Sequence, residues 1–224
     1  MNIIITMFLM FNFPFFSNEK VAVNKVVEKK VEVKKEVKKL TIEEVVNKLK
    51  EHYSTITEIE SNFEQTFFHK AYKRTKKSSG KLYFTNDLKM KWIYKTPEKK
   101  FIISNSKTLW IYEPENEQVF RAKIEGSELE TIAKFLAGRL DLFKDYKLKL
   151  INQKTLFLEP KGEKSFRSIE LTLNDDYKII KTKMVDNFGN INTMIYSNFK
   201  MNNLNLSKSF FEFKVPDGVE LIEN

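Results

Sequence analysis

The chain has 224 residues, no cysteine, and 39 Lys and Arg against 30 Asp and Glu, which gives a formal net charge of +9. The absence of cysteine excludes disulfides, thiolate zinc sites, a cysteine nucleophile and a lipid-modified N-terminal cysteine. A chain of this length is expected to form one large domain with a sizeable hydrophobic core.

The N-terminus predicts an export signal over residues 1–17. Residues 1–16 are apolar except for a few Asn and Thr residues and Pro14, and the run is too short to cross a bilayer comfortably as a helix. No Lys or Arg precedes this run and no small-residue cleavage site follows it. A retained anchor and a mis-assigned start are therefore the alternatives.

Residues 18–39 are rich in Lys, Val and Glu and predict a tether rather than a folded domain. We interpret it as a solvated linker. Contact of its lysines with anionic lipid headgroups and a frayed helix are the alternatives. The folded domain is then expected over residues 40–224.

A helix is predicted to begin after Thr41. Thr41 and Glu44 have the spacing of a capping box, and Leu40 with Val45 has that of a hydrophobic staple. One apolar stripe follows at helical spacing, formed by Ile42, Val45, Val46, Leu49 and Tyr53.

Residues 80–112 alternate large apolar side chains with polar ones, as expected for a meander of antiparallel strands. Met90, Trp92 and Tyr94 share a face, and Lys89, Lys91 and Lys95 occupy the reverse side. Turns are expected at 86–87 and 105–106. Periodicity leaves open whether the apolar face lines a cavity or forms an ordinary filled core.

A second capping box, Ser127 with Glu130, predicts another helix that ends at Gly138. A short further helical turn is expected near Leu142. Strands return after Tyr146 and include residues 179–186 and 191–199. Because helices do not alternate with strands, a large antiparallel sheet or open barrel is expected rather than a parallel fold.

The sequence offers no catalytic or metal-binding constellation. His52 and His69 are the only histidines and fit no metal-ligand spacing, and there is no nucleophile elbow or phosphate-binding glycine loop. Glu58, Glu60 and Glu64 recur at period two and are interpreted as a solvated strand face. We therefore expect no enzyme activity and no metal site.

Nucleic acid binding is also disfavoured. A binding sheet needs its aromatic and cationic side chains on one surface, so that bases stack while phosphates are neutralised. Trp92 and the lysines beside it point in opposite directions.

From about Thr41 to the C-terminus, a series of short motifs resembles the outer-membrane lipoprotein carrier family, LolA. The motifs are Tyr53 with Ile56 and Ile59, Phe63-Glu64-Gln65-Thr66, Gly80-Lys81-Leu82, Lys89-Met90-Lys91-Trp92 with Tyr94 and Pro97, Leu109-Trp110-Ile111-Tyr112, Asp186 with Gly189-Asn190, and residues 211–219. Each motif alone is weak, but their order and spacing together are specific.

The resemblance implies a mainly β fold: an incomplete antiparallel β-barrel covered by a lid of a few α-helices that enclose a hydrophobic cavity. It also implies a monomeric periplasmic chaperone without a cofactor, active in lipid binding, protein transport and outer-membrane biogenesis. In the family, acyl chains of triacylated lipoproteins come from an inner-membrane ABC transporter and pass to an outer-membrane acceptor.

Met90 and Trp92 match positions that face the cavity in the family. Further cavity candidates, chosen by alternation, helix stripe or motif, are Phe63, Leu82, Phe84, Phe101, Ile103, Leu109, Ile111, Ile132 and Leu136. The family commonly has a basic residue and proline before the Met/Phe-x-Trp strand, where its best-known form uses an Arg to latch the lid. This chain has Asn86-Asp87 there, so Asn86 occupies the latch position without the charge.

Two other hypotheses remain open at this point. A binder or sensor of another hydrophobic ligand, such as a glycolipid, fits the same fold. A purely structural β-domain predicts a filled interior and no ligand.

Overall fold

The computed structural model describes residues 39–125, 127–137 and 139–223. Contacts divide the chain into two units, Met1–Lys39 and Leu40–Asn224, and every element below belongs to the second. The export signal predicted at 1–17 and nearly all of the tether predicted at 18–39 lie outside the described residues, as does Gly138, the expected end of the second helix.

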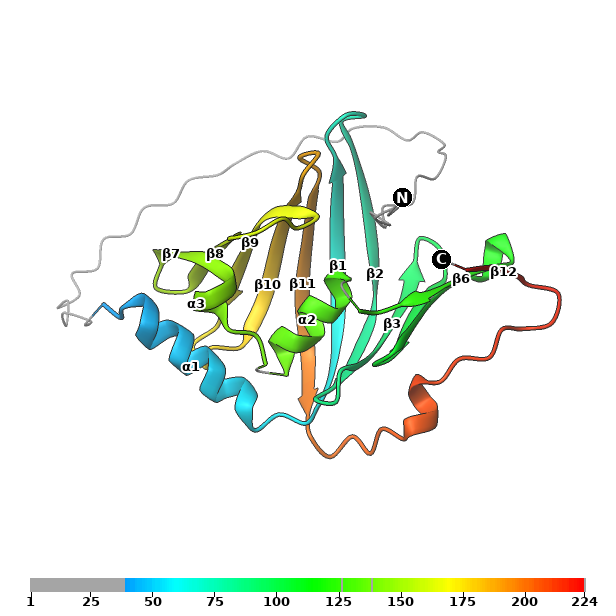
Figure 1. Ribbon diagram of the computed structural model, residues 1–224, viewed down its shortest axis with the longest axis horizontal. Helices are drawn as coiled ribbons and strands as arrows, with labels where there is room; N and C mark the ends of the chain where they lie inside the picture. The colour runs from blue at the N-terminus through cyan, green and yellow to red at the C-terminus, as the bar shows by residue number, and fades with distance from the viewer. Residues whose placement is uncertain (1–38, 126, 138, 224) are drawn as a thin grey trace, which may run out of the picture. The chain divides into compact units, whose positions relative to one another are not determined.

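The described residues of the second unit are mainly β (Figure 1). The strands are β1 (Glu58–His69), β2 (Arg74–Thr85), β3 (Lys89–Thr96), β4 (Lys100–Asn105), β5 (Thr108–Glu113), β6 (Gln118–Lys123), β7 (Tyr146–Asn152), β8 (Thr155–Pro160), β9 (Phe166–Leu173), β10 (Ile179–Asp186), β11 (Ile191–Met201) and β12 (Glu220–Glu223). The helices are α1 (Ile42–Ser54), α2 (Glu128–Leu136) and α3 (Leu142–Asp145), with the 3-10 turns η1 (Pro114–Asn116) and η2 (Lys208–Phe211).

The strands form one sheet in the order β12-β6-β5-β4-β3-β2-β1-β11-β10-β9-β8-β7. All neighbours are antiparallel except β12 and β6, which run parallel. The sheet is curved and ends at β12 and β7 without closing (Figure 1). The predicted incomplete antiparallel barrel with a few helices is therefore confirmed.

The first helix begins as its sequence predicts. The Glu44 amide donates to Thr41 Oγ1 at 3.2 Å, and the Thr41 amide donates to Glu44 Oε2 at 2.8 Å, which completes the capping box. The second box forms only in part. The Glu130 amide donates to Ser127 Oγ at 3.1 Å, but the Glu130 carboxylate ion-pairs with Lys134 and the Ser127 amide donates to the Ile124 carbonyl.

The register assigns side chains to the two faces of the sheet. Leu82 lies opposite Trp92, which lies opposite Ile102, which in turn lies opposite Ile111. Paired residues in a sheet point to the same side. We call this side the inner face; in the first half of the sheet it is formed by Ile59, Phe63, Leu82, Phe84, Met90, Trp92, Tyr94, Ile102, Leu109 and Ile111.

The prediction that Phe101 and Ile103 share the inner face is wrong. Both point to the opposite side, the outer face, where Ile103 forms a buried cluster with Trp110 and Val119. The C-terminal segment covers this cluster through Phe213 and its neighbours Val215 and Val219. Residues 101–103 and 109–111 are continuous apolar runs because both faces of β4 and β5 are buried, so alternation could not set their phase.

Candidate binding site

The inner face brings together seven of the predicted cavity residues. Phe63, Leu82, Phe84, Met90 and Trp92 lie on the neighbouring strands β1, β2 and β3, and each is at most 5 % exposed. The remaining two, on β5, are Leu109 and Ile111. Together with Ile102 on the intervening strand β4, these side chains form a largely apolar surface across five strands.

Aromatic rings centre this surface. The centroid of the Phe63 ring lies 5.2 Å from that of Trp92 and 4.9 Å from that of Tyr94, and both ring pairs are in an edge-to-face arrangement. Gly80, directly opposite Phe63, leaves the room that this ring occupies, since a Cβ there would lie 2.9 Å from Phe63 Cζ. Burial raises the pKa of Tyr94, so its hydroxyl stays neutral.

Two buried polar atoms on the inner face have no hydrogen-bond partner among the described residues, Ser61 Oγ and Trp92 Nε1. Ser61 lies opposite Leu82, and Leu82 lies opposite Trp92, so both belong to one row across β1, β2 and β3. The other inner-face side chains of β1, β2 and β3 named above are apolar or aromatic, and on β4 the same face carries Ser104 and Lys100.

The second half of the sheet extends the inner face, which the sequence-based site residues missed. Phe63 lies opposite Tyr196, where the two halves join. From there the surface continues to buried leucines of the outer strands, namely Leu156, Leu158, Leu171 and Leu173. The signal was present in the alternation of these strands, but no family motif marked it.

Helix α1 is fixed on the inner face at both ends. The Tyr53 hydroxyl accepts a hydrogen bond from the Ile179 amide of β10 at 3.2 Å, and its pKa is raised by burial. At the other end, the Leu40 amide donates to Gln153 Oε1 at 2.6 Å. Between these points Val45, Val46 and Leu49 are at most 2 % exposed.

Helix α2 is held less tightly. Its predicted cavity residues Ile132 and Leu136 are half-buried, whereas Ala133 is fully buried. The centroid of the Phe135 ring lies 6.4 Å from that of the Tyr53 ring on α1. The gap lined by Leu49, Lys50, Tyr53, Phe135, Leu140 and Leu142 measures only ≈ 10 Å³. Little space therefore remains between α1 and the α2–α3 region, and the inner-face side chains of the sheet are buried.

Residues 54–214 match the model of the family described as "Outer membrane lipoprotein carrier protein LolA". The chain belongs to the LolA family. The Nitrosomonas europaea relative is 28% identical over 184 residues, covering 80% of this chain and 89% of its own length. The Chromobacterium violaceum relative is 29% identical over 183 residues, covering 79% and 86%. Both are named "Outer-membrane lipoprotein carrier protein".

A solved structure shares the fold of this LolA-family chain. An uncharacterized conserved protein from Thermus thermophilus superposes with a TM-score of 0.50 at 14% identity, covering 81% of this chain and 98% of that one. This similarity supports the architecture alone.

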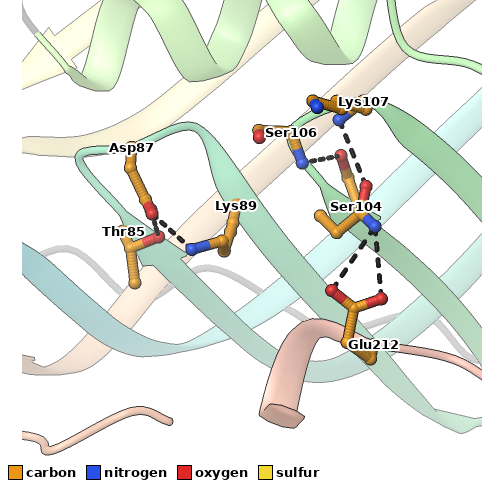
Figure 2. A network of polar contacts seen from close by, with 8 residues as sticks. Thr85, Asp87, Lys89, Ser104, Ser106, Lys107 and Glu212 are labelled. Carbon is orange, nitrogen blue, oxygen red and sulfur yellow. Dashed lines mark hydrogen bonds and ion pairs between the residues drawn. The ribbon is translucent and has the colours of Figure 1, made fainter. Parts of the chain in front are cut away.

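The predicted latch residue, Asn86, lies in the turn between β2 and β3. Asn86 is exposed in the β2–β3 turn, and its amide donates to the Thr57 carbonyl at 2.9 Å. In the same turn, Asp87 accepts hydrogen bonds from Thr85 Oγ1 and Lys89 Nζ (Figure 2). Burial acts to raise the pKa of Asp87, but these hydrogen bonds outweigh it and lower the pKa. Lys89 is thus bound within the turn.

The described part of this LolA-family chain holds no cluster of three or more His, Cys, Asp or Glu residues suited to a metal ion. His52 lies in α1 and His69 at the end of β1. Among the described helices, none is long and apolar enough to cross a bilayer.

Proposed function

We propose that this protein is a periplasmic chaperone that binds the acyl chains of lipoproteins released from the inner membrane and carries them to the outer membrane. The observation that carries the proposal is the largely apolar inner face beneath the helical cover. Membership of a family whose relatives are named lipoprotein carriers supports it. The reaction is transfer without catalysis, so no cofactor is needed.

The partners follow from this role. The cargo is a triacylated lipoprotein, the donor is the inner-membrane lipoprotein-releasing ABC transporter, and the acceptor lies in the outer membrane. The carrier acts as a monomer and binds no nucleic acid. The cavity residues are those of the inner face and of α2, including Met90, Trp92, Ile132 and Leu136.

Loading requires the cover to open, because its apolar side chains now occupy the inner face. Each buried methylene of an acyl chain contributes about 0.8 kcal/mol, so a long chain offsets the cost of separating the helices from the sheet. Helix α2 is the element that moves at least cost, since its larger apolar side chains, Ile132 and Leu136, are only half-buried. In α1, by contrast, Val45, Val46 and Leu49 are fully buried and the helix is hydrogen-bonded at both ends.

The proposal is tested by native mass spectrometry of the protein purified from its own periplasm. We expect a co-purifying triacylated lipoprotein. Another bound lipid would replace the carrier hypothesis by that of a glycolipid or lipid binder, and an unliganded protein would favour a structural domain.

Met90→Glu provides the matched variant. It places a carboxylate on the inner face, so we expect loss of lipoprotein uptake or release. An unfolding curve establishes that the variant is folded, and unchanged lipoprotein transfer by the folded variant would contradict the proposal. Lys95→Glu, exposed at the end of β3, is the control that adds the same side chain away from this face.

A further inference from the structure

Two neighbouring hairpin ends present exposed aromatic side chains. Tyr72, in the turn between β1 and β2, is 57% exposed, and Phe188, in the turn between β10 and β11, is 71% exposed. β1 and β11 are paired, and the Lys70 amide donates to Asn190 Oδ1 at 3.0 Å, so the two turns lie side by side at the top of Figure 1. These rings form an apolar tip that the core does not use.

The second turn is rigid. The buried carboxylate of Asp186 accepts the Phe188 amide at 2.9 Å and the Asn190 amide at 2.8 Å, and its other oxygen accepts from Asn190 Nδ2 at 2.7 Å. Arg167 also donates to the Asn187 carbonyl. The Phe188 ring is therefore held outward on a pre-organised turn, which lowers the entropy cost of binding through it.

Basic residues surround this tip. The segment 70–77 contains five cationic side chains and no acidic one, and 161–167 adds three more with Glu163 as its single acid. Asn187 Nδ2 donates to the Lys164 carbonyl at 2.7 Å, which places this second segment beside the turn. Two of these cations are engaged elsewhere: Lys76 is ion-paired with Glu98 at 2.9 Å, and Lys161 donates to the Phe143 carbonyl of α3 at 2.7 Å. The cations of the tip are Lys70, Lys73, Arg74, Lys77, Lys164 and Arg167.

We propose that this hairpin tip docks the protein on the anionic surface of a phospholipid bilayer. Tyr72 and Phe188 enter the interfacial layer, where aromatic rings are favoured, and the surrounding cations lie against the phosphates. The acid within the second turn, Asp186, is buried and accepts three hydrogen bonds, so its carboxylate does not face the membrane surface. The inference goes beyond cargo binding and does not depend on it, since the tip is distinct from the inner face.

The absence of cysteine allows a site-specific test in the full chain. Ala71→Cys, exposed at the tip, carries an environment-sensitive fluorophore, and Ile151→Cys, 51% exposed on β7, carries the same label as a control. We expect the label at 71, and not at 151, to shift to the blue and to be quenched by lipid-attached quenchers. The vesicles contain equal parts of phosphatidylglycerol and phosphatidylcholine. Vesicles of phosphatidylcholine alone should give little response.

The tip residues are then changed on the labelled background. We expect Tyr72→Ser with Phe188→Ser to weaken the vesicle response about tenfold or more. Lys73→Glu with Lys164→Glu should weaken the response and reduce its salt dependence. Residues 1–39 are identical in all variants, and unchanged unfolding midpoints establish intact folding.

Three results would overturn the proposal: a silent label at 71, a response unaffected by the serine variants, or equal binding to neutral vesicles. A response only to solubilised envelope proteins would reassign the tip to a protein partner.

Discussion

The two tryptophans of this chain lie on opposite faces of one sheet. Trp92 is on the inner face, beside Phe63, and Trp110 is on the outer face beneath Phe213. Trp110→Phe and Trp92→Phe each leave a single tryptophan, which can be excited selectively. We expect an acylated ligand to shift the emission of Trp92 alone. A response confined to Trp110 would place the ligand on the outer face instead.

Gly80 is required for close packing at the centre of the site. A Cβ there would lie 2.0 Å from the Ile93 carbonyl oxygen, a backbone atom that cannot move freely. Gly80→Ala is expected to lower the free energy of unfolding by about 2 kcal/mol or more, measured by urea denaturation. Gly162→Ala, with nothing within 4 Å of the added carbon, should change it by less than about 0.5 kcal/mol. Equal effects of the two substitutions would contradict this account.

His52 makes the stability depend on pH. Burial, followed by the nearby charge of Lys178, lowers the pKa of His52 from its ordinary value of 6.5. The unfolded chain then binds a proton more readily than the folded one, so this contribution is complete above pH 6.5 and is lost as pH falls through the folded pKa. We expect His52→Gln to lose less stability than the parent between about pH 7.5 and about pH 5.5 in urea titrations. Identical losses would show that other groups govern this range.

The C-terminal segment, residues 204–219, runs across the outer face of the sheet, and we call it the strap. Glu58 accepts the Leu204 and Leu206 amides at 2.8 and 2.9 Å, and Lys91 Nζ donates to the Phe210 carbonyl at 3.0 Å. Farther along, Asn105 Nδ2 donates to Glu212 at 3.2 Å (Figure 2). The lysine-bearing reverse side predicted for β3 is therefore partly covered rather than fully solvated.

Glu58→Ala tests the strap. It leaves two backbone amides without their acceptor, so we expect a loss of about 1–3 kcal/mol in unfolding free energy. Hydrogen exchange should quicken at residues 204 and 206. Glu159→Ala removes a carboxylate whose ion pair with Lys147, at 3.2 Å, is exposed, and should cost less than about 0.5 kcal/mol. Unchanged exchange in the Glu58 variant would show that apolar packing alone holds the segment.

How well the sequence predicts the direction of the side chains on a strand depends on whether one face of that strand is exposed to solvent. On β3, Lys89 and Lys91 alternate with Met90 and Trp92, so the phase of the strand was predicted correctly. On β4, the strap buries the second face and removes the alternation, so Phe101 and Ile103 were assigned to the wrong side. The helix starts were predictable because capping is local. The second capping box lacks the hydrogen bond from the Ser127 amide to the Glu130 side chain, and the Glu130 carboxylate forms an ion pair with Lys134 instead.

At the scale of the whole molecule, the proposed carrier must replace contacts between its helices and its sheet by contacts with acyl chains when it binds cargo. The contacts that resist opening are unequal: α1 is hydrogen-bonded to the sheet region through Tyr53 and Leu40, whereas Ile132 and Leu136 of α2 are only half-buried. Position 153, which no sequence motif marked, supplies one of these bonds from the turn between β7 and β8. The cover therefore opens at the α2 end in our interpretation.

A covalent crosslink tests whether acyl chains enter through movement in the region of α2. Lys50 on α1 and Leu140, just after α2, line the same gap of ≈ 10 Å³, and the chain has no other thiol to interfere once both are replaced by cysteine. Bridging Lys50→Cys with Leu140→Cys by a short bifunctional maleimide should slow lipoprotein loading about tenfold or more, because acyl chains enter only when the cover separates. The same double variant capped with a monofunctional maleimide should load at nearly the parent rate. Normal loading by the bridged protein would mean that the acyl chains enter while the segment that follows α2 stays against α1.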